Sequence, residues 1–422
     1  MVSRGVVIGV VAAVVLVALI GGVVFSQYLF TPPGPPAPSE IIIGVNLPLT
    51  GGSAPIGLTG KETLDIWVEE VNAKGGLFVK QFNKRIPVKT IVLDDQSNPT
   101  VSAQNIERLA NEGALVVFGP AGTVYALSAA PAAERLKMPI ITVQTSTAEL
   151  TRRGFRYVFS AYKHFYQDWP VLFDVIENLI PADQRPKTFA VISDNTAFGR
   201  EALVSLVDVA KARGYGDRIV LKENVTAGQT DFTPSILKLK SLNPDVLIDI
   251  LFFHSDVFNF DRQMKANNYY PKLYVGWTAH SFVSYADTLK EDSDYAIVTA
   301  VTWHPALPYP GSKEFAEKFR AKYNKEPGKE HGADYAALQI IANAIETVPT
   351  LTREAIRDAI ANTKMTTIIG PTEFMKEGTS DPGRMVSPGY AIQWRGMKQV
   401  LIWPKDLATG SLTYPAPAWD RR

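Results

Sequence analysis

The sequence predicts an α/β fold in which buried parallel strands alternate with helices, and three observations support this class. Short apolar runs such as Val88–Asp95 and Ala114–Phe118 have the length and composition of buried parallel strands. Each run ends in a polar or glycine-containing corner that opens a segment of helical periodicity. The same succession recurs after about residue 160, so two similar strand–helix series are expected along the chain.

The amino terminus is expected to be separate from this fold. Residues 1–4 carry one positive charge, at Arg4, and residues 5–25 are apolar and uncharged. That run is long enough to span a bilayer as a helix and longer than the apolar part of a cleaved signal peptide. We therefore expect a cytoplasmic end at residues 1–4 and an uncleaved transmembrane anchor at residues 5–25, with a cleaved signal segment as the alternative. Residues 26–39 are rich in proline and predict an extended, semi-rigid linker.

The first strand–helix series begins directly after the linker. Ile41–Leu47 is an apolar run typical of a buried parallel strand. Thr59 and Glu62 have the spacing of a capping box, and the helix that they begin is expected to end at Gly75-Gly76. The later strands of this series are expected at residues 88–95, 114–118 and 139–143.

The second series has the same character and is followed by a different tail. Its strands are expected at residues 188–193, 218–221, 245–251 and 272–276. Two late helices are indicated at residues 333–344 and 352–362 by apolar residues that recur on one face. A short strand at residues 370–374 and a hairpin formed by residues 390–394 and 399–403 complete the expected elements.

Composition excludes several classes of function. Lys and Arg number 43 and Asp and Glu 42, so the chain lacks the basic excess of a nucleic-acid-binding protein. There are no cysteines, which rules out disulfides, thiolate metal sites and cysteine nucleophiles. The five histidines lack the spacing of metal ligands, and no nucleophile motif of a hydrolase is present. We expect no metal, no cofactor and no catalytic residue, and we predict that the chain is not an enzyme.

Two polar corners predict a binding site. Gly119–Thr123 and Gln144–Thr147 follow strands that are consecutive in the first series. A parallel sheet binds ligands at the carboxyl ends of its strands, so these corners are expected to lie close together. Hydroxyl groups and the free amides of a helix amino terminus favour an anion. The corners therefore predict a site for a small carboxylate.

Several segments, in this order, carry a resemblance to a known family. IGVNLPLTGGSAPIGLTGKETLDIWVEEVNAKGG (Ile43–Gly76) resembles the opening of type 1 periplasmic solute-binding proteins, most closely the leucine/isoleucine/valine-binding kind. The other segments that fit the family are LDDQSNPTVSAQNIERLANEGALVVFGPAGT (Leu93–Thr123), ELTRRG (Glu149–Gly154), DNTAFGREA (Asp194–Ala202), VTAGQTDFTPSILKLKSLNPD (Val225–Asp245) and IGPTEF (Ile369–Phe374). The resemblance covers nearly all of residues 41–400.

This resemblance implies the periplasmic binding protein type 1 fold. That fold has two Rossmann-like α/β lobes joined by three crossover segments, with the ligand between the lobes. In this chain the crossovers are expected near Ala161, Trp303 and Pro371. Lobe 1 would then comprise residues 40–161 and 304–370, and lobe 2 residues 162–303 and 371–422.

The resemblance also implies ligand-binding residues. Thr123 matches a hydroxyl residue that binds the ligand carboxylate, and Thr145 and Ser146 match further carboxylate and amino contacts. Ordinary helix capping explains these residues as well. His164 stands where amino-acid binders commonly have an acid, and Phe198 where they often have tyrosine. Phe253 and His254 fall near another aromatic position of the binding site.

Trp277 and Thr278 are the most informative departure from the family. Amino-acid binders often have a glutamate near Thr278 that neutralises the ligand ammonium, and burying an ammonium without an acid is costly. Asp256 is a possible substitute, although the start of a surface helix explains it equally well. The ligand is therefore an amino acid bound in a different way, or a carboxylate or amide without an ammonium. Trp277, Phe198 and Phe253 would suit an apolar or aromatic body, and each is also typical of a core.

The resemblance implies a function in uptake. The chain would be the extracytoplasmic substrate-binding component of an ABC importer, which captures an amino acid or related small carboxylate or amide by hinge closure. Its partners would be ABC permease subunits in the membrane, to which the amino-terminal helix would tether it. The alternative is a ligand-sensing ectodomain that works with a separate signalling partner.

Overall fold

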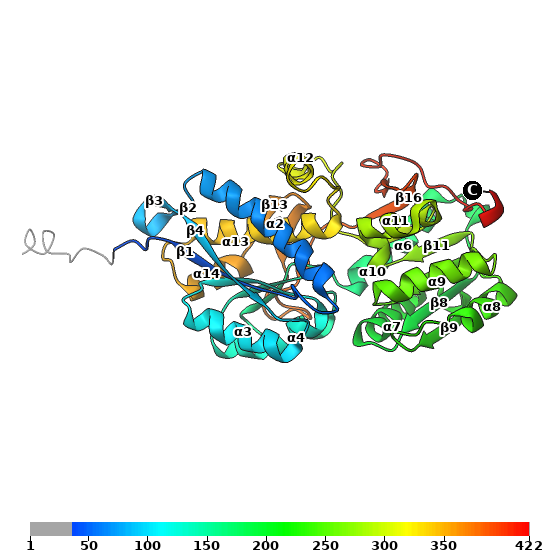
Figure 1. Ribbon diagram of the computed structural model, residues 1–422, viewed down its shortest axis with the longest axis horizontal. Helices are drawn as coiled ribbons and strands as arrows, with labels where there is room; N and C mark the ends of the chain where they lie inside the picture. The colour runs from blue at the N-terminus through cyan, green and yellow to red at the C-terminus, as the bar shows by residue number, and fades with distance from the viewer. Residues whose placement is uncertain (1–35, 422) are drawn as a thin grey trace, which may run out of the picture. The chain divides into compact units, whose positions relative to one another are not determined.

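The computed structural model describes residues 36–421 (Figure 1). The chain divides into two units, Met1–Ser39 and Glu40–Arg422, and the second contains all the helices and strands reported below. The expected anchor at residues 5–25 and the cytoplasmic end at residues 1–4 lie outside the described residues. None of the helices in residues 36–421 is both long enough and apolar enough to cross a bilayer.

A five-stranded parallel sheet forms the centre of the first lobe. Its strands, in spatial order, are β4 (Val88–Asp94), β1 (Ile41–Leu47), β5 (Val116–Ala121), β6 (Ile140–Val143) and β7 (Val158–Ser160). Strand β1 is fixed on both sides, because Val45 pairs with Val92 of β4 and with Phe118 of β5. All the strands expected in the first series are present, and their carboxyl ends share one edge of the sheet.

Helices cover both faces of this sheet. Helices α3 (Pro99–Asn111) and α4 (Thr123–Arg135) pack together on one face, and α2 (Ala54–Ala73) packs on the other (Figure 1). Helix α2 begins at Ala54 rather than at the predicted Thr59. The hydroxyl of Thr59 donates to the carbonyl oxygen of Pro55 at 2.9 Å, so Thr59 lies inside the helix and caps nothing. The residues at this earlier start of the helix form part of the polar wall of the cavity described below.

A seven-stranded sheet forms the centre of the second lobe. In spatial order it contains β17 (Lys398–Trp403), β16 (Tyr390–Arg395), β12 (Ile297–Val301), β11 (Leu273–Gly276), β10 (Val246–Ile250), β8 (Phe189–Asp194) and β9 (Ile219–Val225). The last five of these strands are parallel, and the carboxyl-terminal hairpin adds β16 and β17 in antiparallel pairing. The expected tail hairpin is therefore part of this sheet.

The helices of the second lobe are α6 (Phe165–Leu179), α7 (Ala197–Ala212), α8 (Thr233–Leu242), α9 (His254–Ala266), α10 (Thr278–Ser281) and α11 (Val283–Leu289). Buried aromatic side chains dominate the packing between α6, α7 and the sheet, with Trp169 and Phe173 of α6 among them. The indole Nε1 of Trp169 donates to the carbonyl oxygen of Ala202 at 3.0 Å, which satisfies the one polar atom of this side chain.

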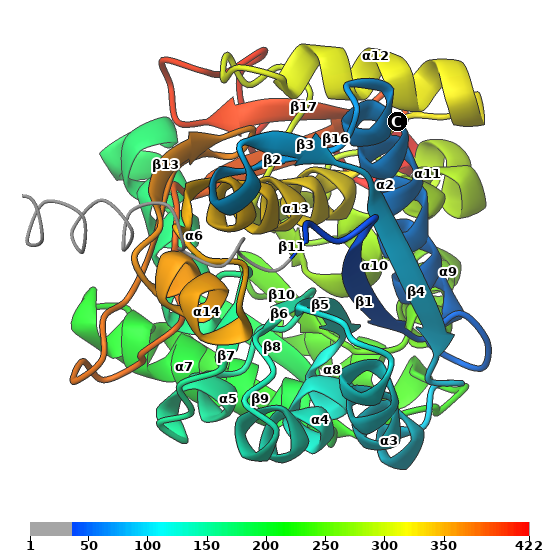
Figure 2. The same ribbon diagram turned by 90° about the vertical axis from the view of Figure 1, so that its left-hand side faces the viewer.

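Residues after β12 return to the first lobe. Helices α12 (Ser312–Tyr323), α13 (Lys329–Thr347) and α14 (Arg353–Ala361) follow, and α13 packs against α2 and against strands β5 and β6 (Figures 1 and 2). Two small antiparallel sheets complete the fold. They are the hairpin β2 (Leu77–Val79) with β3 (Lys84–Ile86), and the three strands β13 (Lys364–Thr367), β14 (Gly370–Phe374) and β15 (Met385–Val386).

The chain passes between the two large sheets at three places. It leaves the five-stranded sheet after Ser160 and leaves the seven-stranded sheet after Val301. The third passage lies later than the predicted position near Pro371. Strand β14, which contains Pro371, pairs with β13 and β15, and the chain rejoins the seven-stranded sheet only at Tyr390. We therefore place the third crossover at residues 387–389. Gly370 adopts φ +105° in a hairpin turn, and the sequence gives no sign that the chain continues in a local sheet after that turn.

Candidate functional site

One cavity is lined by loops that follow strands of both large sheets and by the first residues of α13. Its volume is about 270 Å³, close to the lower end of the range for small-molecule sites. The loops come from the carboxyl ends of β1, β5 and β6 in the first lobe and of β8, β10 and β11 in the second. This is the edge at which parallel sheets bind ligands.

The wall from the first lobe is polar. Ser53 is the N-cap residue of α2, and its side chain accepts no hydrogen bond from that helix. Gly122 is the N-cap residue of α4 and has no side chain that could cap it. Thr123 is the first residue of α4, and Gly122 adopts φ +97°, which brings the backbone to the cavity. The hydroxyl of Ser53 lies 2.7 Å from the hydroxyl of Tyr125. Two long helices thus direct their amino termini to one wall, an arrangement that favours an anion.

Ser146 lines the cavity and Thr145 does not. The chain turns at Gln144, which has φ +51°, and Thr145 is buried with its hydroxyl donating to the carbonyl oxygen of Val143 at 3.0 Å. The side chain of Thr145 therefore does not line this cavity, unlike that of Ser146. The N-cap of the next helix, α5 (Ala148–Arg152), is Thr147, so capping does not explain Ser146.

The wall from the second lobe is aromatic. The residues that line it are Phe198, Phe252, Phe253, His254, Trp277, Thr278 and Phe282. The ring centroid of Trp277 lies 4.3 Å from that of Trp169 and 5.4 Å from that of Phe165, so the core of the lobe holds this indole.

Little charge is available on the aromatic wall. Burial lowers the pKa of His254 to about 4, so its imidazole is neutral at pH 7, and its ring packs 4.7 Å from that of Phe282. The hydroxyl of Thr278 donates to the carbonyl oxygen of Leu251. This wall can receive an apolar or aromatic body.

His164 lies outside the cavity lining. It is the N-cap residue of α6, and its buried ring lies with Nε2 4.0 Å from Oδ2 of Asp381. Burial, reinforced by Arg384 and Arg152, lowers the pKa of His164 to about 3. The side chain of His164, which was predicted in the pocket, faces the segment between β14 and β15. Asp256, the substitute acid considered above, is also absent from the lining, and its carboxylate accepts the backbone N–H of Gly228 at 2.7 Å.

Two charged residues of the cavity were missed. Lys329 and Glu330 open α13 and line the cavity, although their side chains are only about 5% and 4% exposed. Their charged atoms Nζ and Oε1 lie 3.6 Å apart. Burial raises the pKa of Glu330 and lowers that of Lys329. Charged residues after Pro327-Gly328 are typical of a solvated first helical turn, so the sequence offered no signal for a buried pair.

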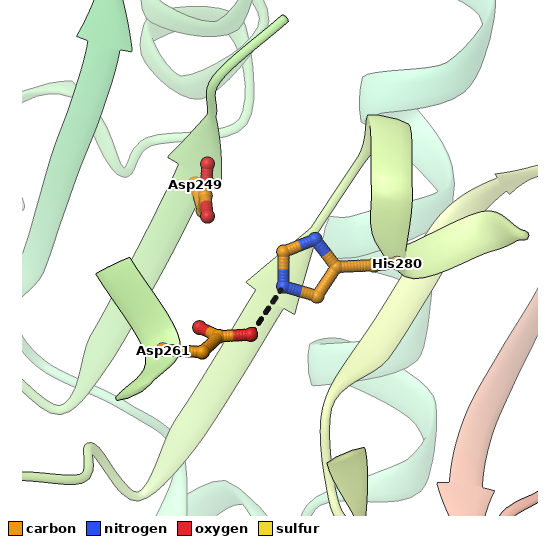
Figure 3. A group of neighbouring side chains, drawn as sticks. All are labelled: Asp249, Asp261 and His280. Atoms are coloured by element: carbon orange, nitrogen blue, oxygen red, sulfur yellow. Dashed lines mark ion pairs between the residues drawn. The ribbon is translucent and has the colours of Figure 1, made fainter. Parts of the chain in front are cut away.

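A second group of buried ionisable side chains lies in the second lobe away from this lining. Asp249, Asp261 and His280 bring potential ligand atoms within 4.8 Å of one another (Figure 3). The hydroxyl of Tyr274 lies 3.0 Å from Oδ2 of Asp249 and 2.6 Å from Oδ1 of Asp261, and the hydroxyl of Tyr285 donates to Oδ2 of Asp261 at 2.7 Å.

The charge state of this group follows from its donors. Tyr274 has one hydroxyl proton, so both of its contacts are satisfied when Asp249 is protonated and donates to it. Burial, followed by the neighbouring Asp261, raises the pKa of Asp249 well above its usual range, in agreement with that assignment. Burial lowers the pKa of His280 to about 3. The two aspartates and the two tyrosines form a hydrogen-bonded part of the core, and the ring nitrogens of His280 have no hydrogen-bond partner among residues 36–421.

Comparisons with known proteins agree with the fold. Residues 40–399 match the periplasmic binding protein family. "Leu/Ile/Val-binding protein homolog 7" of Brucella suis biovar 1 (strain 1330) is 24% identical over 405 residues, which cover 90% of this chain and 95% of the relative.

Two solved structures share the fold. The branched-chain amino acid transporter substrate-binding protein LivJ of Streptococcus pneumoniae, in complex with isoleucine, superposes with a TM-score of 0.74 at 19% identity and covers 86% of this chain and 100% of its own. A solute-binding protein of an ABC transporter from R. palustris, in complex with benzoate, gives a TM-score of 0.73 at 19% identity and covers 90% and 98%.

These matches bear directly on the predictions. The α/β class and the resemblance stated from the sequence are confirmed by the family match and by the shared fold. The matched proteins are solute-binding proteins, so the prediction that the chain is not an enzyme is also confirmed. Because one family match spans residues 40–399, the chain belongs to the periplasmic binding protein family.

Proposed function

We propose that this chain is the extracytoplasmic substrate-binding component of an ABC importer. It captures a small carboxylate, either an amino acid or an aromatic acid, in the cavity between two Rossmann-like lobes joined by three crossover segments. The observation that carries the proposal is the two-sided lining of the cavity. A polar wall with two helix amino termini faces an aromatic wall with no ionised side chain, and the two walls belong to different lobes.

The two walls assign the two ends of the ligand. The carboxylate meets the hydroxyls of Ser53, Thr123 and Ser146 and the amides of the first turns of α2 and α4. The apolar or aromatic body packs against Phe198, Phe253 and Trp277, whose rings offer a large contact area. LivJ was solved with isoleucine and the R. palustris protein with benzoate, and both ligands combine a carboxylate with an apolar body. This shared chemistry supports the assignment.

Binding is coupled to hinge closure in this proposal. A ligand that contacts both lobes binds the closed form more tightly than the open form. The free energy by which it stabilises the closed form is set by this difference in affinity. The closed form then docks on ABC permease subunits in the membrane, which carry out transport. The chain works outside the cytoplasm, tethered by residues 5–25 and held away from the bilayer by the linker at residues 26–39.

A thermal-shift screen tests the proposed function. The purified protein is heated with amino acids, short aliphatic acids, aromatic acids and the corresponding amides. A ligand that binds only the native state raises the melting temperature, and at one hundred times its Kd it adds about 2.7 kcal/mol to the free energy of unfolding. Stabilisation by carboxylates and none by their amides is the expected result. No shift with any carboxylate would overturn the proposal.

The tether is tested separately. Glu40–Arg422 forms a compact unit with its own core, so a chain that starts at Glu40 is expected to fold and to bind the same ligands. Membrane fractionation of the full chain and of this shorter chain measures the contribution of residues 1–39. Membrane association of the shorter chain would contradict the assignment of the tether.

A further inference from the structure

One contact between the two lobes lies outside the lining of the ligand cavity. It joins Glu201 of α7, in the second lobe, to Thr147 and Ala148 of the first lobe, where α5 and α7 come together (Figure 2). The hydroxyl of Thr147 donates to Oε2 of Glu201 at 2.5 Å, and the backbone N–H of Ala148 donates to Oε1 at 2.7 Å. None of these three residues lines the cavity. We call this pair of hydrogen bonds the interlobe contact.

The first lobe holds its donors in place before the second lobe is considered. Thr147 is the N-cap residue of α5, and its hydroxyl oxygen accepts the backbone N–H of Glu149 at 3.1 Å. A hydroxyl group has one proton, so this bond leaves the proton of Thr147 free to point at Glu201. The N–H of Ala148 belongs to the backbone next to it. The carboxylate of Glu201 thus meets two donors whose positions are set by the first lobe alone.

The surroundings make this contact specific to closed lobes. Thr147, Ala148 and Glu201 border a groove of about 640 Å³ that is lined by α4 and α5 of the first lobe and by α6 and α7 of the second. Burial raises the pKa of Glu201, and the hydrogen bonds from Thr147 and Ala148 lower it. These bonds replace the water that the carboxylate loses when the lobes meet. When α5 and α7 separate, both bonds break and water returns.

We propose that Glu201 is a positioning residue that holds the two lobes together and so raises the affinity of the cavity for each of its ligands. This inference rests on the proposed function, because it assumes that binding is coupled to hinge closure. The apparent Kd equals the Kd of the closed form divided by the closed fraction of the unliganded protein. Loss of the interlobe contact lowers that fraction, so it weakens all ligands by one common factor. Loss of a lining residue weakens each ligand according to what that ligand touches.

Titration calorimetry with L-leucine, L-phenylalanine and benzoate tests the common factor. For each of these probes that binds, Glu201→Ala is expected to weaken binding by the same factor, about 3- to 30-fold, because two hydrogen bonds to a charged group are lost from the closed form. Glu201→Gln keeps an oxygen that can accept the N–H of Ala148, so its loss of affinity should be smaller. Unchanged affinity in folded Glu201→Ala, or losses that differ strongly between probes, would overturn the inference.

Glu149→Ala is the matched control. Glu149 belongs to α5 and borders the same groove, but its carboxylate pairs with Arg153 of the first lobe. Its removal is the same chemical change without loss of the interlobe contact, so affinity should stay within about twofold of that of the unaltered protein. A loss as large as that of Glu201→Ala would overturn the inference. If Glu201→Ala does not fold, Glu201→Gln decides in its place.

A distance measurement tests the same inference without a ligand. The chain has no cysteine, so Gln104→Cys in α3 and Ala212→Cys in α7, both at exposed positions, can carry one spin label on each lobe. Pulsed electron paramagnetic resonance gives the distribution of distances between the labels. Glu201→Ala is expected to move the unliganded distribution away from the closed arrangement, and Glu149→Ala is expected to leave it unchanged. If none of the three probes binds, the proposed function is in question, whereas an unchanged distribution in Glu201→Ala would overturn the role of Glu201.

Discussion

The two groups of buried ionisable side chains differ in where they lie. In the core of the second lobe, Asp249 and Asp261 are hydrogen-bonded to Tyr274, Tyr285 and a backbone amide, and both ring nitrogens of His280 are without a hydrogen-bond partner among the described residues. At the cavity, Lys329 and Glu330 are paired with each other, and one oxygen of Glu330 has no hydrogen-bond partner in the described part of the chain. Both groups are buried, and only the second belongs to the cavity lining.

Their positions assign the two groups different roles. Hydrogen bonds made inside a core contribute to its stability and are costly to break. Polar side chains that line a cavity can in addition contact a ligand. We expect substitutions in the core group to change unfolding and substitutions around the cavity to change binding.

The largest effect is expected from Asp261→Ala. This change removes the carboxylate that accepts the Tyr285 hydroxyl and is the closer acceptor of the Tyr274 hydroxyl in a fully buried region. An unsatisfied buried donor costs about 1–3 kcal/mol, so the free energy of unfolding should fall by about 3 kcal/mol. Urea unfolding measures the loss. Asp292→Ala is the control, because Asp292 pairs with Lys265 at the surface and should change stability by less than about 1 kcal/mol. Equal losses in the two variants would remove the distinction drawn for the core group.

A pH series with His280→Gln sharpens the comparison within the core group. The pKa of His280 falls from its ordinary 6.5 to about 3 in the folded state, so below pH 6.5 the unfolded chain binds a proton that the folded chain does not. The unaltered protein therefore loses stability as the pH falls from 6.5 toward 3, and the variant lacks this part of the loss.

The measurement is the difference in unfolding free energy between the two proteins. As the pH falls from 6.5 to 4.5, the unfolding free energy of His280→Gln should rise by about 2 kcal/mol relative to that of the unaltered protein. Other titrating groups cancel in this difference. A difference that does not vary with pH would show that His280 is not held neutral by its surroundings.

Thr123→Ala tests the polar wall of the cavity. The hydroxyl is expected to meet the ligand carboxylate, so its removal should weaken binding by about 1–3 kcal/mol, measured by titration calorimetry. Thr145→Ala is the matched control, since its hydroxyl is bonded to Val143 inside the lobe and lies off the lining. A larger loss of affinity in Thr145→Ala than in Thr123→Ala would mean that Thr145, and not Thr123, contacts the ligand.

Phe253→Ala should have the smallest effect on stability. Its side chain lines the cavity and is 40% exposed, so the free energy of unfolding should change by less than about 1 kcal/mol while ligand affinity falls. Phe260 lies in helix α9, which follows Phe253, and is fully buried, so Phe260→Ala should cost about 3–5 kcal/mol. Thermal unfolding of the two variants compares them. Similar losses would mean that the aromatic wall belongs to the core.

Helices and strands were predicted well where the local pattern of apolar and polar residues is enough to determine them. Apolar runs with polar corners located the strands of the two large sheets except β7 and β12. Thr123 and Trp277, which follow two of the predicted strands, line the cavity. The third crossover was placed too early because Gly370 signals a turn but not the partner of the next strand.

The cavity residues that were missed depend on the tertiary structure. Thr145 was included because nothing in the sequence reveals that Gln144 adopts a positive φ and turns the next side chain inward. Lys329 and Glu330 were passed over because charges in a first helical turn are usually solvated. Their burial arises only when α13 packs on the first lobe and meets Ala300 and Ser281 of the second.

A crystal structure of the protein with the ligand that gives the largest thermal shift tests the central claim most directly. We expect the carboxylate within hydrogen-bond distance of Thr123 and Ser146 and the body of the ligand against Trp277 and Phe198. A ligand bound in the opposite orientation, or outside the space between the two walls, would contradict the account.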